Sequence, residues 1–249
     1  MTNFADHFSG RARDYARYRP DYPEALFEFL ADLAPERRTA WDCATGSGQA
    51  ALGLAGRFDA VVATDASTDQ IASAARHARV HYAVAVAEAA PLASGSVSLV
   101  AAAQALHWFD RARFWEEVRR VLVPGGVIAV WSYHGFHAGP EVEAVVQRFY
   151  KDIVGPYWPP ERALVEQGYG ALEFPFTPVE PPLFPLEKLW DLPALIGYLR
   201  TWSATQRYEA ARGHDPLELI REELAAAWGP PERVRTFGWD LDLRIGRKQ

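Results

Sequence analysis

The sequence has little cysteine, no excess of basic charge and no long apolar run. Cys43 is its only cysteine, which excludes an intrachain disulfide and a cysteine-rich zinc site. Acidic residues outnumber basic ones by 32 to 26, and no basic run occurs, so we expect neither nucleic acid nor an anionic membrane as a partner. No run of about 18 apolar residues predicts a membrane span, and the polar N-terminal stretch predicts no signal peptide. We therefore expect a cytoplasmic globular protein.

Short apolar runs alternate with helical patterns between residues 39 and 133. The runs predict buried strands at 39–43, 60–64, 81–86, 97–103 and 126–132. The clearest helix between them carries on one face Phe114, Trp115, Val118, Val121 and Leu122. Such alternation is typical of an α/β fold, in which helices cover both faces of a parallel sheet.

Two regions flank this core, which we place at 36–135. An N-terminal arm and a helix are expected in 1–35, the helix beginning with Asp21 as an acidic N-cap, Pro23 in the first turn and Glu24 at the capping-box position. Nine of the 18 prolines lie between 156 and 193, too many for regular sheet, among too many aromatic residues for a disordered linker. Residues 140–230 are therefore expected to form an ordered aromatic cap with helices near 192–203 and 215–228, before a final strand in 235–249.

A glycine loop, Asp42-Cys-Ala-Thr-Gly-Ser-Gly48, follows the first predicted strand. Gly46 and Gly48 allow a tight turn and a close approach of a ligand, and Asp65 ends the next strand at a distance suited to a ribose. An ordinary turn would use the same glycines, but this position favours a nucleoside-binding crevice. Asp42 would repel a pyrophosphate and suits a ligand with an ammonium group, which favours S-adenosylmethionine over a nicotinamide dinucleotide.

These motifs resemble the class I S-adenosylmethionine-dependent methyltransferases that act on small molecules. The loop corresponds to the family's D-x-G-x-G-x-G, and Leu122-Val-Pro-Gly-Gly126 to the turn before its fifth strand. A narrower likeness is to the trans-aconitate methyltransferase-like subgroup of the methyltransferase type 11 kind. It rests on Tyr15-x-x-x-Arg19-Pro-x-Tyr-Pro23 and on Gln104-Ala-Leu-His-Trp-Phe-Asp110. The likeness implies a single domain over 1–249, with a Rossmann-like, seven-stranded, mostly parallel sheet.

The resemblance also implies where the cofactor binds. Asp65 would hold the ribose hydroxyls, and Arg19 of the arm would pair with the methionine carboxylate, which suits the guanidinium fork. Alternatively, Tyr15 and Arg19 only attach the arm to the globule. The implied set of cofactor-binding residues is Tyr15, Arg19, Asp42, Ala44, Gly46, Gly48, Asp65, Ala66, Gln70, Ala87, Glu88, Gln104 and Leu106.

Two positions depart from the family pattern. Ala44 replaces the family's first glycine, and its methyl group is tolerated if φ there is negative. Val86 stands where many relatives have an aspartate that reads the adenine, which would leave adenine recognition to the backbone near Ala87 and to Glu88. A non-catalytic S-adenosylmethionine binder, a nicotinamide-dependent oxidoreductase and a structural module remain as alternatives. Titration with both cofactors would identify the last two, and the non-catalytic binder would bind S-adenosylmethionine but turn over no acceptor.

His107 follows the fourth predicted strand, where open α/β sheets place their ligand. It either plugs the strand end or faces the acceptor as a base, since a neutral imidazole near pH 7 can take a proton. Trp108, His134 and Trp202 are expected to line the acceptor pocket. No metal is expected, because His134 and His137 lack further ligands in the sequence. The predicted reaction is in-line methyl transfer to a small organic acceptor, at a carboxylate or hydroxyl oxygen.

Overall fold

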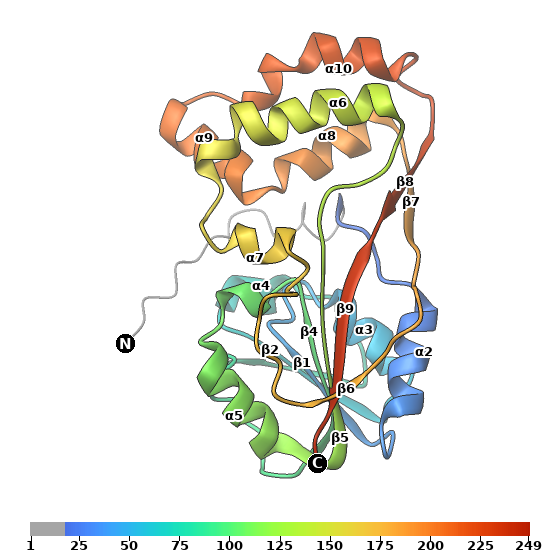
Figure 1. Ribbon diagram of the computed structural model, residues 1–249, viewed down its shortest axis with the longest axis vertical. Helices are drawn as coiled ribbons and strands as arrows, with labels where there is room; N and C mark the ends of the chain where they lie inside the picture. Colours follow the sequence, from blue (N-terminus) through green and yellow to red (C-terminus); the bar gives the residue numbers. More distant parts are fainter. Residues whose placement is uncertain (1–17) are drawn as a thin grey trace.

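The computed structural model describes residues 18–249, and its central element is a seven-stranded sheet (Figure 1). The strand order is β3-β2-β1-β4-β5-β9-β6, and only β9 runs antiparallel to its neighbours. The strands are β1 (Thr39–Cys43), β2 (Ala60–Asp65), β3 (Val80–Val84), β4 (Val97–Ala103), β5 (Leu122–Tyr133), β6 (Thr177–Val179) and β9 (Leu241–Arg247). This topology confirms the predicted α/β fold with a mostly parallel sheet.

Helices bury both faces of this sheet. On one face α2 (Glu24–Leu33) and α3 (Gln49–Ala55) pack an apolar core that includes Leu30 and Leu54. On the other face α5 (Arg111–Val121) packs a second core around Trp41 and Phe114. Because β4 and β5 are buried on both faces, their sequences are almost continuous apolar runs rather than alternating ones. A short helix, α4 (Thr68–Ser73), follows β2.

The start of α2 differs from the prediction. Pro23 occupies the N-cap position and no side chain caps the helix, so the expected acidic cap at Asp21 is wrong. The carboxylate of Asp21 instead forms an ion pair with Lys188, far along the chain. The side chain that local spacing assigned to the helix cap therefore forms a long-range ion pair instead.

A helical cap stands at one end of the sheet (Figure 1). It consists of α6 (Pro140–Arg148), a π turn (Phe149–Ile153), 3-10 turns at Gly155–Tyr157 and Pro216–Leu219, α7 (Arg162–Glu166), α8 (Leu192–Arg200), α9 (Ser203–Arg212) and α10 (Arg221–Trp228). The cap has its own apolar core, which includes Phe149, Leu195 and Trp228. Within residues 18–249, no helix is long and apolar enough to cross a membrane.

The proline-rich region contains regular strands, which the sequence analysis excluded. Strand β6 includes Pro178 and lies at the edge of the main sheet, where a missing N–H donor is tolerated. Strand β7 (Leu186–Trp190) pairs with β8 (Arg235–Trp239) in a separate two-stranded ribbon. The single expected final strand is therefore two strands, β8 beside the cap and β9 in the sheet. They follow one another from the level of the cap down to the C-terminus in Figure 1.

Two predicted cap helices are also divided. The pattern over 192–203 spans α8, which ends at Arg200, and the start of α9 at Ser203. The pattern over 215–228 begins as the 3-10 turn Pro216–Leu219 and continues as α10. Apolar spacing located both segments correctly but could not detect the breaks within them, because 3-10 and α-helical turns differ little in period over a few residues.

Candidate functional site

The strand order reverses between β1 and β4, so the loops after these strands open a crevice at the carboxyl edge of the sheet. Gly46 and Gly48 in the loop after β1 have φ values of 54° and 89°, which glycine adopts readily. A Cβ atom on Gly48 would also lie 2.4 Å from the hydroxyl oxygen of Tyr82. The predicted glycine loop is therefore a turn that requires glycine for both conformation and space.

Ala44 in the same loop has a φ of 55°, not the negative value that the sequence analysis required. The left-handed region costs an L-residue about 1–2 kcal/mol because Cβ crowds the following carbonyl oxygen. The next residue, Thr45, donates its N–H to the carbonyl oxygen of Thr64 at 2.8 Å, which links the loop to β2. The loop thus keeps the shape of a glycine turn while an alanine bears the strain.

Asp42 is fully buried beneath this loop. The Thr45 hydroxyl donates a 2.5 Å hydrogen bond to its carboxylate. Burial nevertheless raises the pKa of Asp42 to about 7, so the carboxyl is partly protonated near neutral pH. Its other carboxylate oxygen, Oδ1, is buried and has no hydrogen-bond partner among residues 18–249.

Asp65 lies at the end of β2, as the sequence predicted, and its carboxylate joins two loops there. One carboxylate oxygen accepts the N–H of Gly46 and the other that of Ser67, each at 2.9 Å. Ser67 in turn caps α4 by accepting the N–H of Gln70. The side-chain oxygen of Gln70 is buried and has no hydrogen-bond partner among residues 18–249.

The loop after β3 carries the residues expected at the adenine. The side chain of Ala87 is buried and Val86 is 46% exposed, while Ala66, after β2, is half-buried. Glu88 already has a structural partner, because its carboxylate accepts the N–H of Asp110 at 2.8 Å, just before α5.

A cleft between the sheet edge and the cap brings together six of the predicted site residues. Its volume is about 60 Å³. The predicted residues that line it are Arg19, Gln104, His107, Trp108, His134 and Trp202. The sequence analysis missed the others, which are Tyr133, Gly135, Trp158, Pro159, Arg162, Tyr198 and Ser203.

His107 contacts a tyrosine that no motif indicated. Its Nδ1 atom shares a 2.8 Å hydrogen bond with the hydroxyl of Tyr169, which is fully buried and has a φ of 58°. Burial, and then the positive charge of Arg162, lower the pKa of His107 from 6.5 to about 3. The imidazole is therefore neutral at pH 7, and a pKa this far from the working pH favours a role other than the expected proton transfer, since a base works best with a pKa near the working pH.

Other predicted residues are held by neighbours in the cleft. Gln104 has a φ of 54° and donates its amide to the carbonyl oxygen of Tyr133 at 2.9 Å. Arg19 donates to the hydroxyl oxygen of Thr201 at 3.1 Å and lies over the ring of Tyr198. Leu106 is fully buried in the core beside α5, so its side chain does not border the cleft. Tyr15 lies outside the described residues.

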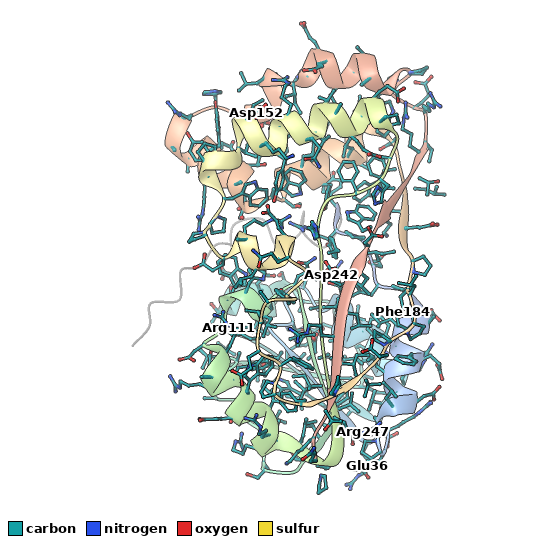
Figure 2. All side chains as sticks on the ribbon, viewed as in Figure 1. Glu36, Arg111, Asp152, Phe184, Asp242 and Arg247 are labelled. Atoms are coloured by element: carbon teal, nitrogen blue, oxygen red, sulfur yellow. The ribbon has the colours of Figure 1, made fainter. Side chains whose placement is uncertain are left out.

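His134 follows β5 and has a carboxylate neighbour that the sequence could not indicate. Its Nδ1 atom lies 3.4 Å from an oxygen of Asp242 on β9. Figure 2 labels Asp242 at the level where the cap meets the sheet. Trp202, from the turn before α9, packs among the rings of Phe149, Tyr150 and Trp158.

The missed residues carried little or no local signal. Trp158 belongs to the proline- and aromatic-rich stretch, which the sequence analysis placed in the cap without assigning it to the site. Tyr169 lies between two glycines in a loop, and only its partner explains its position. Arg162 begins α7 and resembles any surface arginine in the sequence.

The comparisons with known proteins agree with this geometry. The model of a protein family that is described as a methyltransferase domain matches residues 41–130, from β1 into β5. A protein of Dictyostelium discoideum named as a methyltransferase is 33% identical over 231 residues, which cover 91% of this chain and 88% of that protein. A methyltransferase of Schizosaccharomyces pombe, named as uncharacterised, is 30% identical over 86% of each chain.

A solved structure is similar along nearly the whole chain. It is that of a type II methyltransferase from Anaeromyxobacter dehalogenans, with 49% sequence identity and a TM-score of 0.86, over 92% of this chain and 98% of that one. The glycine loop and the acidic residue at the end of β2 also lie within residues 41–130, which the family model matches. The chain therefore belongs to the class I S-adenosylmethionine-dependent methyltransferases.

Proposed function

We propose that this methyltransferase acts on a small organic acceptor, which binds in the cleft between the sheet edge and the cap. The observation that carries the proposal is the origin of the lining residues. Gln104 and His107 come from the sheet edge, whereas Trp158, Arg162 and Trp202 come from the cap. A cleft lined by aromatic side chains suits a small organic molecule better than a polymer.

The residues present fit S-adenosylmethionine, which supplies a methyl group activated by a sulfonium. Asp65 would hold the ribose hydroxyls, since it stands beside the glycine loop at the switch point of the sheet. The buried oxygen of Gln70, which lacks a partner among the described residues, is a further acceptor beside the same loop. Arg19, which already lines the cleft, would pair with the methionine carboxylate, because its guanidinium matches the geometry of that group.

Asp42 supports the loop from below rather than touching the cofactor. Its burial and its bond from Thr45 support this assignment. The adenine would lie against the backbone near Ala87, because Glu88 is bonded to Asp110.

His107 orients the acceptor rather than removing its proton. Its neutral ring, held through Nδ1 by Tyr169, presents the remaining nitrogen as a hydrogen-bonding group. Methyl transfer by in-line displacement then depends on alignment of the acceptor and exclusion of water by the aromatic rings. A carboxylate oxygen is already ionised at neutral pH and needs no base, whereas a phenol would react as the phenolate after losing its proton to water.

Cofactor titration and an acceptor screen test this function. We expect calorimetry to show binding of S-adenosylmethionine and none of NADH. We expect formation of S-adenosylhomocysteine with some member of a panel of small acids, phenols and amines. Binding without turnover of any acceptor would favour the non-catalytic binder, and binding of NADH alone would favour an oxidoreductase.

A further inference from the structure

A second cavity adjoins the cleft and is not explained by cofactor binding. Its volume is about 230 Å³, and it extends beneath α6 and beside α7. The cavity and the cleft share four lining residues, His134, Gly135, Arg162 and Trp202. Together they approach the lower end of the roughly 300–1,000 Å³ that small-molecule sites usually have.

Arg162 stands at this junction as a partly buried cation. Its Nε atom donates a 2.7 Å hydrogen bond to the Tyr150 hydroxyl, and its guanidinium lies 4.7 Å from the centre of the Trp158 ring. Its side chain is 20% exposed, and its ion pair with Glu166 spans 3.8 Å through the same Nε. Neither terminal nitrogen of Arg162 has a recorded hydrogen bond to any residue from 18 to 249.

The acidic groups around the second cavity already have partners. Glu143 accepts the N–H groups of Ala138 and Gly139, and Glu166 accepts the Tyr150 hydroxyl. The two terminal nitrogens of Arg162 are therefore available as a pair of hydrogen-bond donors. Their fork-like arrangement matches the geometry of a carboxylate or phosphate. A guanidinium that is fixed on an aromatic ring loses little side-chain freedom when it binds such a group.

We propose that Arg162 binds an anionic group of the acceptor, and that this group is a handle rather than the atom that is methylated. The inference rests on the proposed function. An oxygen whose charge is neutralised by arginine is a poor nucleophile, so the reacting atom lies on another part of the acceptor, toward Gln104 and His107. The acceptor is thus an acid with a second nucleophilic group, and its body lies against Trp202, which lines both cavities, and extends into the second cavity.

Binding of matched probes to Arg162→Gln tests the handle directly. The probes are benzoate and phenyl phosphate, which carry the anion, and benzamide, which has the shape of benzoate without its charge. We expect wild-type protein to bind both anions about tenfold or more tightly than benzamide, as charge-assisted hydrogen bonds predict. The preference should disappear in Arg162→Gln. It should weaken but persist in Arg162→Lys, which keeps the charge and loses the fork, and which provides a second test if the glutamine variant is unstable.

Arg212→Gln is the matched control. Arg212 also donates its Nε to a tyrosine hydroxyl at 2.7 Å, that of Tyr157, but it lines neither cavity. The anion preference should survive in this variant. Equal binding of benzamide and benzoate by wild type, absence of anion binding at millimolar concentration, or an anion preference that persists in Arg162→Gln would each overturn the proposal. Loss of S-adenosylmethionine affinity in Arg162→Gln would also overturn it, by assigning the arginine to the cofactor.

Turnover of matched acceptors separates this inference from the proposed function. If wild type methylates para-hydroxybenzoate and para-hydroxybenzamide equally well, the methyltransferase function stands and the anionic handle is wrong. If anions bind through Arg162 while no acceptor yields S-adenosylhomocysteine, the anion site stands and the proposed catalytic function is wrong.

Discussion

The Nδ1 atom of His107 and the hydroxyl of Tyr169 are joined by a 2.8 Å hydrogen bond between two buried side chains. His107 follows β4 of the sheet, whereas Tyr169 belongs to the segment after α7 of the cap. The bond therefore joins the two parts of the molecule beside the cleft and fixes the orientation of the imidazole that faces it.

Tyr169→Phe should destabilise the protein and slow methyl transfer. The variant leaves a buried ring nitrogen without its partner, which costs about 1–3 kcal/mol. Denaturant unfolding measures the stability, and steady-state kinetics should show a lower kcat because the acceptor is less well oriented. Tyr157→Phe, which removes a hydroxyl bonded to the exposed Arg212, serves as control. Unchanged stability and rate in Tyr169→Phe would remove the bond from the mechanism.

His107 should lower the free energy of unfolding at acidic pH, but the pH profile of kcat should show no step near pH 7 that is due to this residue. Its pKa is lowered from 6.5 to about 3 in the folded state, so the unfolded chain binds the proton more readily between these values. The stability that this group contributes is present above pH 6.5 and is lost as the pH falls toward 3. The free energy of unfolding of His107→Asn should therefore decline less over this range than that of wild type. A kcat profile with a step near pH 6.5 that His107→Asn abolishes would restore the base role.

Asp42 should have the opposite effect on the pH dependence of stability. Its folded-state pKa is raised from 3.8 to about 7, so its contribution is fully present below pH 3.8 and is lost as the pH rises through 7. Asp42→Asn remains neutral at every pH and should gain stability relative to wild type between these values. Denaturant titrations at pH 4 and pH 8 measure the difference. If the free energies of unfolding of the variant and the wild type differ by the same amount at pH 4 and at pH 8, the carboxyl of Asp42 does not titrate in this range.

Ala44→Gly should stabilise the fold. Glycine relieves the strain of a φ of 55°, which predicts a gain of about 1 kcal/mol after its greater freedom in the unfolded chain is counted. Ala34→Gly is the control, because Ala34 has a φ of −68° and glycine there should only destabilise. Thermal unfolding of the three proteins ranks them, and a less stable Ala44→Gly protein would show that the alanine methyl packs favourably enough to offset the strain.

Asp65→Ala should weaken S-adenosylmethionine binding. Loss of hydrogen bonds to a charged group predicts a cost of about 1.5–3 kcal/mol, which calorimetry measures. Asp59→Ala, at an exposed position just before β2, should leave affinity unchanged. Because Asp65 also holds Gly46 and Ser67, circular dichroism must first show that the variant is folded. A folded Asp65→Ala protein with wild-type affinity would place the ribose elsewhere.

The sequence by itself determined the α/β core. Apolar runs located β1, β2 and β4 within a residue, because strands buried on both faces contain few polar residues. The glycine loop and Asp65 were also predictable, since a tight turn after a strand requires glycine and the parallel strands end at one edge. These features depend on residues close together in the chain or on a repeated pattern.

Only the tertiary structure decided the features that depend on distant partners. Asp42 is buried on β1, between β2 and β4. The bond of Tyr169 to His107 and the position of Arg162 between two cavities arise from how the cap packs on the sheet. Pro178 lies in a strand because β9 supplies an edge where its missing donor is not needed. Neither periodicity nor local spacing indicates how the cap will bury His107 or which side chains will surround Arg162, although burial is the main cause of the lowered pKa of His107.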